Sequence, residues 1–198
     1  MVVDRSELTA NLQGFYDFEG KSALCVGAGG GLILDPSSGV ARVVAVDRDA
    51  GALQKFRAES KAKWAGVPLR FIPRKFETVN VRSDVVYFEF CMHMMDDPHK
   101  ALQHARSIAP DIIVMDHRPG SKWVYYWAGE EEVLRSTKAL ESFGVRRQKE
   151  FVAEQRFKDW EAFAARLSGE GEESRRRVLE LKGAEEVHMR MDYGLYLL

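Results

Sequence analysis

The sequence predicts a doubly wound α/β domain built around a mostly parallel sheet. From Ala23 onward, short apolar runs rich in β-branched residues alternate with longer amphipathic stretches, which is the pattern of strands connected by helices. Several apolar runs are almost continuous, as is typical of strands covered by helices on both faces. A length of 198 residues suits one domain with a substantial core.

Seven segments are expected to form strands. The first five strands are short and apolar, and the last two, in the C-terminal third, are longer. In the final segment apolar residues alternate with His188, Arg190 and Asp192, so one of its faces is more polar than the other. The expected strands span residues 22–26, 41–46, 69–72, 84–90, 111–115, 145–157 and 187–197.

Helices are expected between these strands, and their ends carry recognisable signals. Asp97 followed by Pro98 predicts a helix start, because aspartate caps the first turn and proline fits the first helical position. Gly66 and Gly144 predict helix ends. Residues 168–174 are expected to form a polar loop, and the basic run 175–177 a solvated face. The expected helices span about 50–64, 98–109, 130–143 and 158–167.

Composition excludes some classes of protein. The formal net charge is −1, so no general field attracts a polyanion and no nucleic-acid partner is expected. The apolar runs fall far short of the roughly 20 residues of a membrane span, and the charged start MVVDRSEL is unlike a signal peptide. Cys25 and Cys91 lie in apolar runs, which favours buried reduced thiols. We therefore expect a cytoplasmic protein with no membrane partner.

A glycine-rich turn follows the first expected strand. The segment ALCVGAGGG contains Gly27, Gly29 and Gly31, and Asp47 ends the second strand 20 positions beyond Gly27. Glycines let the backbone approach a ligand, and a carboxylate at the tip of the next strand can accept bonds from both ribose hydroxyls. A tight turn with Asp47 as a helix cap is the simpler alternative. A dinucleotide site prefers G-x-G-x-x-G, but Leu32 occupies the third glycine position.

These glycines and Asp47 resemble the cofactor site of class I S-adenosylmethionine-dependent methyltransferases. The resemblance is carried by ALCVGAGGG, VVAVDRD and DVVYFEFCMHMMDDPHKAL, covers about residues 21–115, and continues more weakly to the C-terminus. It implies S-adenosylmethionine as cofactor and a Rossmann-like sheet of seven strands. The antiparallel last strand would be EVHMRMDYGLYLL. The cofactor-binding residues that it implies are Gly27, Ala28, Gly29, Gly31, Asp47, Arg48, Glu89 and Phe90.

The resemblance also implies a domain organisation. The chain would form a single domain over residues 1–198, in which residues 1–20 form an N-terminal cap and residues 145–198 complete the sheet.

Three features depart from the family pattern. Cys25 stands where the first strand usually has an acid, so whatever that carboxylate orients must be held otherwise. Asp35 and Pro36 cut short the helix expected after the glycines. The acid that often reads the adenine amino group is missing from FIPRKFETV. There, Phe76 is a candidate to stack on adenine and Glu77 to accept from its amino group, against the alternative of a core phenylalanine and a solvated glutamate.

The loops after the fourth and fifth strands should face the reacting group, because ligands of open α/β sheets lie at the carboxyl ends of the strands. His93 and His117 are candidate general bases there, since histidine titrates near neutrality; hydrogen-bonded loop histidines are the alternative. No metal is expected, because no histidine pair has helical i, i+4 spacing and no cysteine cluster is present. Asp116 nevertheless keeps open a metal site like that of catechol methyltransferases.

Aromatic residues crowd positions 123–127. Trp123, Tyr126 and Arg118 are candidates to contact an aromatic or anionic acceptor, and packing of a lid is the alternative. The loop after the fourth strand has no Asn/Asp-Pro-Pro-Tyr element, and the chain has no basic excess. A small molecule is therefore the expected acceptor.

The leading hypothesis is an S-adenosylmethionine-dependent methyltransferase. A non-catalytic nucleoside-binding module that uses the surface at 123–127 for a partner protein is the second hypothesis, motivated by Cys25 and Asp35-Pro36. A nicotinamide-dependent dehydrogenase is the third. A homodimer is compatible with each of them.

Overall fold

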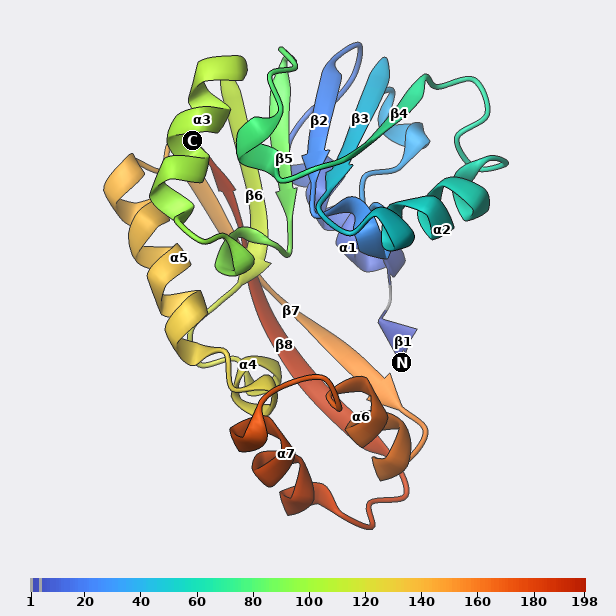
Figure 1. Ribbon diagram of the computed structural model, residues 1–198, viewed down its shortest axis with the longest axis vertical. Coiled ribbons are helices and arrows are strands. Elements are labelled where there is room, and N and C mark those ends of the chain that lie inside the picture. The colour runs from blue at the N-terminus through green and yellow to red at the C-terminus, as the bar shows by residue number, and fades with distance from the viewer. Residues whose placement is uncertain (1, 4) are drawn as a thin grey trace.

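The computed structural model describes residues 2–3 and 5–198. In this part of the chain one sheet is flanked by helices (Figure 1). Met1 and Asp4, which belong to the predicted N-terminal cap, lie outside the described residues. The strands are β1 (Val2–Val3), β2 (Ser22–Val26), β3 (Arg42–Asp47), β4 (Leu69–Pro73), β5 (Val85–Glu89), β6 (Asp111–His117), β7 (Arg147–Phe157) and β8 (Val187–Leu197). The helices are α1 (Arg5–Phe15), α2 (Ala50–Ser60), α3 (Pro98–Ile108), α4 (Lys122–Trp127), α5 (Glu130–Phe143), α6 (Trp160–Arg166) and α7 (Glu172–Val178).

The order of the strands confirms the predicted fold class. The described sheet has eight strands in the order β1-β7-β8-β6-β5-β2-β3-β4. Strands β2 to β6 pair in parallel, and β8 is antiparallel to both of its neighbours, so β7 runs in the same direction as β6. The sheet is thus mostly parallel with an antiparallel C-terminal strand. The eighth strand is β1, which pairs with the far end of β7.

The sheet is buried on both faces because alternate side chains of each central strand enter different cores. In β2, Ala23 and Cys25 pack in a core shared with α1 and α2, whereas Leu24 and Val26 pack in a core shared with α3 and α5. This explains the nearly continuous apolar runs. When helices cover both faces of a sheet, the side chains on both faces of each strand are buried.

The predicted helix signals are observed, with one shift of a boundary. Asp97 accepts a hydrogen bond from the Lys100 N–H at 3.0 Å and Pro98 begins α3. Gly144, at a φ of 100°, ends α5. Helix α2 ends at Ser60, before the expected boundary, and Trp64 is buried in the turns that follow.

Three helices were not predicted from the sequence. Helix α1 lies within the expected N-terminal cap, α4 covers the aromatic cluster, and α7 replaces part of the expected polar loop and basic face. The interior of α1 does carry a helical signal, because Leu8, Leu12 and Phe15 are all buried on one face.

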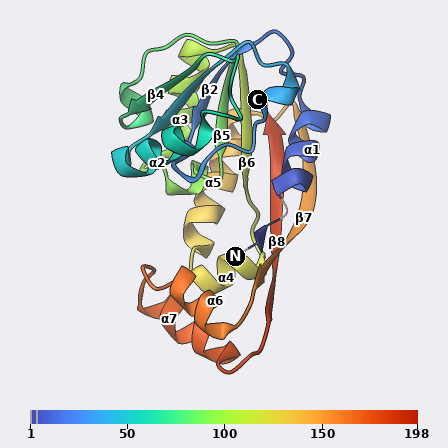
Figure 2. The same cartoon turned by 90° about the vertical axis from the view of Figure 1, so that its right-hand side faces the viewer.

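The far ends of β7 and β8 leave the body of the molecule. These strands pair over residues 147–157 and 187–197, but β6 pairs only with residues 193–197 of β8. Helices α4, α6 and α7 pack at this protruding end (Figures 1 and 2). We call the protruding ends of β7 and β8 with α4, α6 and α7 the lobe. Phe157 lies in its core, 5.1 Å from Phe163 and 6.2 Å from Trp123 between ring centroids.

No helix among residues 2–3 and 5–198 combines the length and the apolar character needed to cross a membrane.

The two-core arrangement predicts a strong contrast between two leucines. Leu102 of α3 is fully buried, whereas Leu134 of α5 is 45% exposed. Leu102→Ala should lower the free energy of unfolding by about 2–5 kcal/mol, because it leaves a cavity under the sheet. Leu134→Ala should change it by less than about 0.5 kcal/mol. Urea denaturation followed by tryptophan fluorescence measures both, and similar losses would contradict the assigned core.

Candidate functional site

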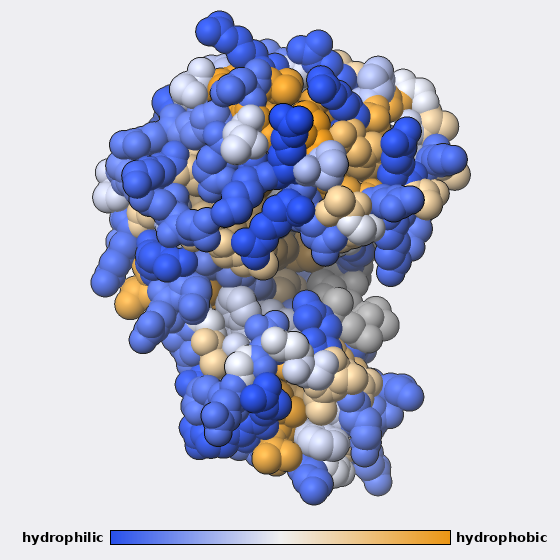
Figure 3. Space-filling view, in the orientation of Figure 1, coloured by the Kyte–Doolittle hydropathy of each residue, from blue (hydrophilic) through white to orange (hydrophobic). Residues whose placement is uncertain are grey.

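A cavity of about 830 Å³ opens at the carboxyl ends of the parallel strands. It runs from the glycine turn after β2 to residues of the lobe, and Figure 3 shows a recess between the body and the lobe. Its volume lies near the top of the range of about 300–1,000 Å³ for small-molecule sites. Eleven predicted site residues line it: Gly27, Gly29, Gly31, Asp47, Arg48, Phe76, Glu77, Glu89, Phe90, His117 and Trp123.

Two positions in the turn require glycine. Gly27 has a φ of 83°, and a Cβ added there would lie 2.7 Å from the Cβ of Cys91. A Cβ added at Gly29 would lie 2.8 Å from the Oδ2 atom of Asp47. The missing side chains therefore let the turn pack directly against the ends of β3 and β5. Ala28, the non-glycine residue between them, is buried beneath the turn.

Asp47 ties the turn to the start of α2. Its Oδ2 atom accepts a hydrogen bond from the Gly29 N–H at 2.8 Å, and its Oδ1 atom accepts one from the Asp49 N–H at 2.9 Å. Asp49, not Asp47, caps α2, because its side chain accepts from the Ala52 N–H at 3.0 Å. Each carboxylate oxygen can accept a second bond, so Asp47 can still bind hydroxyl groups of a ligand in the cavity.

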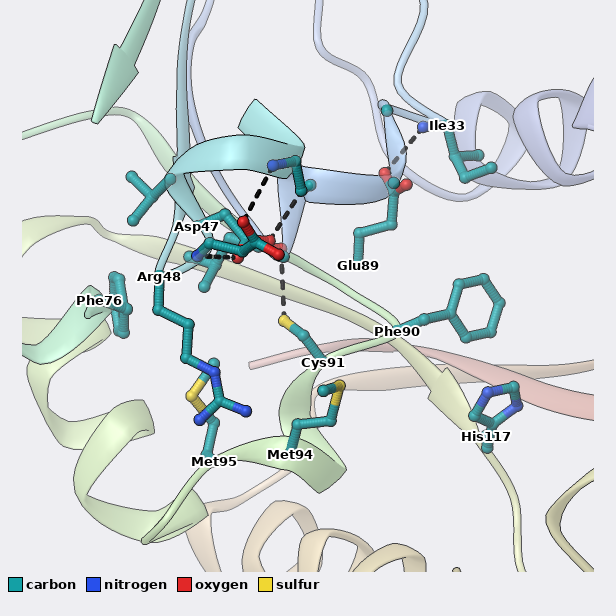
Figure 4. A pocket seen from close by; sticks show the side chains of 18 of the residues that line it. Ile33, Asp47, Arg48, Phe76, Glu89, Phe90, Cys91, Met94, Met95 and His117 are labelled. Atoms are coloured by element: carbon teal, nitrogen blue, oxygen red, sulfur yellow. Dashed lines mark hydrogen bonds between the residues drawn. The ribbon is translucent and has the colours of Figure 1, made fainter. Parts of the chain in front are cut away.

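Glu89 places a second carboxyl group at the glycine turn, from the end of β5. It is 7% exposed, lines the cavity, and its Oε2 atom accepts from the Ile33 N–H at 2.8 Å (Figure 4). Burial raises the pKa of Glu89 to about 7, although the Ile33 amide and the charge of Arg5 act in the opposite direction. Burial and the charge of Glu89 together raise the pKa of the Cys25 thiol.

Cys25 and Cys91 are both buried free thiols, as expected from the apolar runs that contain them. The Sγ atom of Cys91 donates to the Val26 carbonyl at 3.3 Å and therefore braces β2 against the loop after β5.

Asp116 brings the two candidate histidines together. Its carboxylate contacts Nδ1 of His93 at 2.6 Å and accepts from the backbone N–H groups of His93 and His117, each at 2.8 Å. His93 is buried behind the wall of the cavity, with its ring 4.7 Å from that of Trp127. His117 is the histidine that lines the cavity.

The environment of His117 favours the neutral ring. Burial lowers the pKa of His117 to about 4, against the charge of the adjacent Asp116. Its Nδ1 atom is buried and has no hydrogen-bond partner among the described residues. A neutral imidazole with a free ring nitrogen can hydrogen-bond to a ligand.

Phe90 lines the cavity beside His117. It has a φ of 46°, in the left-handed region that residues other than glycine rarely adopt. Its ring lies 4.9 Å from that of His117. Figure 4 shows Asp47 and Glu89 between Phe76 and Arg48 on one side and Phe90 and His117 on the other.

The three predicted acceptor contacts occupy different places. Trp123 lines the cavity, whereas the ring of Tyr126 packs 5.3 Å from Phe163 within the lobe. Arg118 forms an ion pair with Glu150 at 2.7 Å. Tyr126 and Arg118 are not among the cavity-lining residues.

The cavity-lining residues that sequence reasoning missed include Arg5, Gln155, Arg166 and Met191. Arg5 and Arg166 lie on exposed positions of short helices without a motif. The position of Gln155 could have been noticed in the sequence. It is a polar residue on the buried face of β7, between Ala153 and Phe157.

No group of three or more histidine, cysteine, aspartate or glutamate side chains in the described part of the chain is arranged to hold a metal ion.

The fold and the cavity define an α/β domain with a site at the carboxyl ends of its parallel strands, and a family model matches part of this domain. Residues 24–110 match the model described as a methyltransferase domain. This segment runs from β2 to the end of α3 and contains Asp47, Glu89 and the glycine turn. No curated protein sequence matches the chain.

Solved structures share the fold over nearly the whole chain. A candidate methyltransferase from Bacillus halodurans C-125 aligns with a TM-score of 0.67 and 15% identity, over 98% of this chain and 97% of the other. An S-adenosylmethionine-dependent methyltransferase from Aquifex aeolicus gives 0.57 and 17%, over 98% and 89%. Magnesium protoporphyrin IX methyltransferase from Synechocystis PCC 6803, with bound S-adenosylmethionine, gives 0.55 and 12%, over 97% and 77%.

These findings confirm the resemblance stated from the sequence. Residues 24–110 therefore match a methyltransferase domain, and the chain shares its fold with solved methyltransferases, one of which holds bound S-adenosylmethionine.

The packing of the turn predicts that an alanine substitution destabilises the protein at one of two adjacent glycines and leaves its stability unchanged at the other. Gly29→Ala should lower the melting temperature of the free protein, because the new methyl group would push against Asp47 and Ala52, at 2.8 and 3.0 Å. Gly30→Ala is the matched control, since a Cβ there meets nothing within 4 Å. Calorimetry should show a loss for Gly29→Ala alone. Equal melting temperatures would contradict the close contact between the turn and Asp47.

Proposed function

We propose that the protein transfers a methyl group from S-adenosylmethionine to a small molecule bound between the body and the lobe. The observation that carries the proposal is the Asp47 carboxylate bound to the Gly29 amide at the mouth of a cavity that continues to the lobe. The net charge of −1 supports a small acceptor over a polyanion.

In this proposal the glycine turn and Asp47 hold the nucleoside. The backbone of Gly27, Ala28, Gly29 and Gly31 would approach the cofactor, and the free acceptor positions of Asp47 would bind the ribose hydroxyls. The adenine would lie toward Phe76, Glu77 and Arg48, which line the same end of the cavity. Phe76 is 3% exposed and its ring contacts Phe88 at 5.1 Å and His104 at 5.0 Å, so only the part of the residue that lines the cavity would contact the base.

Glu89 would replace the acid that the first strand lacks. Cys25 occupies the family's usual acidic position, and the carboxyl group of Glu89 reaches the glycine turn from the neighbouring strand instead. A carboxylate there would bind the amino group of the cofactor's methionine part, because a buried negative charge is stabilised by a cationic partner. Arg5, which also lines the cavity, would face the carboxylate of that part.

The chain's residues would position the acceptor for transfer. S-adenosylmethionine supplies an activated methyl group, whose bond to sulfur breaks as the acceptor's lone pair forms the new bond, with the electron pair left on sulfur. Holding the acceptor in line can contribute up to about 7–11 kcal/mol to the barrier reduction. His117, whose pKa is lowered to about 4, would orient the acceptor through a hydrogen bond of its neutral ring, while Asp116 and His93 fix the position of this loop.

Removing the carboxylate of Asp47 should weaken the cofactor site. By calorimetry, Asp47→Ala should bind S-adenosylhomocysteine about tenfold or more weakly than the wild type, because charge-assisted hydrogen bonds are worth about 1.5–3 kcal/mol each. Asp17→Ala, an exposed aspartate outside the cavity, serves as control. Absence of binding by the wild type would overturn the proposed cofactor site.

Transfer of labelled methyl groups tests the acceptor class. The wild type, incubated with labelled S-adenosylmethionine and a cell extract, should label the small-molecule fraction. Label in protein or nucleic acid would contradict a small acceptor. Intact S-adenosylhomocysteine binding without any transfer would favour the non-catalytic binding module.

The proposed role of Glu89 predicts that cofactor affinity depends on pH. Because the pKa of Glu89 is raised to about 7, the carboxyl group is mostly neutral at lower pH and must lose a proton to bind an ammonium group. Affinity for S-adenosylhomocysteine should therefore rise between about pH 5.5 and about pH 7, by up to about tenfold per unit, while the ligand's amino group stays protonated.

Glu89→Gln keeps an acceptor for the Ile33 amide but cannot ionise. We expect it to bind more weakly at pH 7 and to lose the dependence on pH. Glu59→Gln, an exposed substitution on α2, should retain that dependence. The same rise of affinity with pH in Glu89→Gln would contradict the role of Glu89.

A further inference from the structure

The lobe end of the cavity is built differently from the nucleoside end. Gln155 and Met191 reach it from β7 and β8, Trp123 from α4 and Arg166 from α6. The body contributes Phe90 and His117 to the same cavity. The inference below rests on the proposed function, because it concerns the acceptor that would face the methyl group.

Gln155 has an unused hydrogen-bond acceptor at this end. Its side chain is 3% exposed, and its Nε2 atom donates to the sulfur of Met191 at 3.2 Å. A thioether sulfur only accepts hydrogen bonds, so the amide nitrogen faces Met191 and the oxygen is left over. No donor among the described residues reaches that buried oxygen. Since an unpaired buried carbonyl is costly, it indicates a ligand that supplies an O–H or N–H group.

Arg166 provides a cation at the same end. Its guanidinium carbon lies 5.6 Å from the centre of the Trp123 ring, and it forms no ion pair with a carboxylate of residues 2–3 or 5–198. The neighbouring Arg177 of the lobe, by contrast, is paired with both Glu130 and Glu173. A guanidinium held against an aromatic ring, with its donors free, matches the geometry of a carboxylate.

The walls between these polar groups are apolar and partly aromatic. Phe90 lies on the body side, and Trp123 and Met191 lie on the lobe side. Trp123 is 5% exposed and stacks on Phe157, so its ring is held in place. Rigid aromatic walls favour a flat ring as ligand.

From these contacts we propose that the lobe end of the cavity binds an aromatic carboxylic acid that carries a hydroxyl or amino group. The carboxylate pairs with Arg166, the ring lies between Phe90 and Trp123, and the hydroxyl or amino hydrogen is donated to the free oxygen of Gln155. Binding is stronger for the anion than for a neutral analogue of the same shape.

Matched pairs of ligands test this proposal on protein saturated with S-adenosylhomocysteine. The probes are 3- and 4-hydroxybenzoate and 4-aminobenzoate, each with its primary amide, and unsubstituted benzoate. We expect each substituted acid to bind about fivefold or more tightly than its amide in ligand-observed NMR titrations. Arg166→Gln should remove the difference between acid and amide. Gln155→Met should weaken the substituted acids but not benzoate.

Arg175→Gln is the matched control, because Arg175 lies on α7 outside the cavity. S-adenosylhomocysteine binding is measured first for every variant, so a failure of the cofactor site is distinguished from a failure of the acceptor site. With cofactor binding intact, equal affinities for acids and amides would overturn the proposal. Absence of binding by the whole panel, or an unchanged preference in Arg166→Gln, would overturn it as well.

Discussion

The contact between the Asp47 carboxylate and the Gly29 amide, at 2.8 Å, fixes the geometry on which the site depends. It is available only because position 29 has no side chain, since a Cβ there would overlap the carboxylate. The same carboxylate also binds the Asp49 amide at 2.9 Å and thereby couples the turn to the first turn of α2. The Asp47 side chain therefore sets the position of the turn and of the helix that follows β3. The same side chain lines the cavity.

A second carboxyl group, that of Glu89, is buried at the site, and its burial raises its pKa. Glu89 lies under the turn next to the thiol of Cys25, where desolvation disfavours a charge. In the free protein the Ile33 amide and the charge of Arg5 compensate only in part, which leaves the pKa of Glu89 at about 7. A cationic ligand group would complete the compensation.

Features that depend on local sequence were predictable. The strands followed from continuous apolar runs, Asp97 and Pro98 marked the start of α3, and the glycine turn identified one end of the cavity. Each of these signals acts within a few residues of its effect, so no knowledge of tertiary contacts was needed. The fold class and the similarity of residues 24–110 to a methyltransferase domain could therefore be predicted from the sequence.

The acceptor end depended on contacts between distant segments. Arg118 is close in sequence to the aromatic cluster, but Glu150 holds it in an ion pair, while Arg166, far along the chain, lines the cavity. His93 and His117 are equivalent by position in their loops, and only the tertiary structure shows that His117 lines the cavity and His93 does not. The lobe arises because β7 and β8 continue past the end of β6. No sequence motif indicates how far these two strands extend.

The central claim is that the glycine turn, Asp47 and Glu89 form the S-adenosylmethionine site. A crystal structure of the protein with S-adenosylhomocysteine tests it most directly. The account predicts both ribose hydroxyls within hydrogen-bonding distance of the Asp47 carboxylate, with the amino group of the ligand at Glu89. A nucleoside bound elsewhere, or bound in this cavity with its ribose away from Asp47, would contradict it.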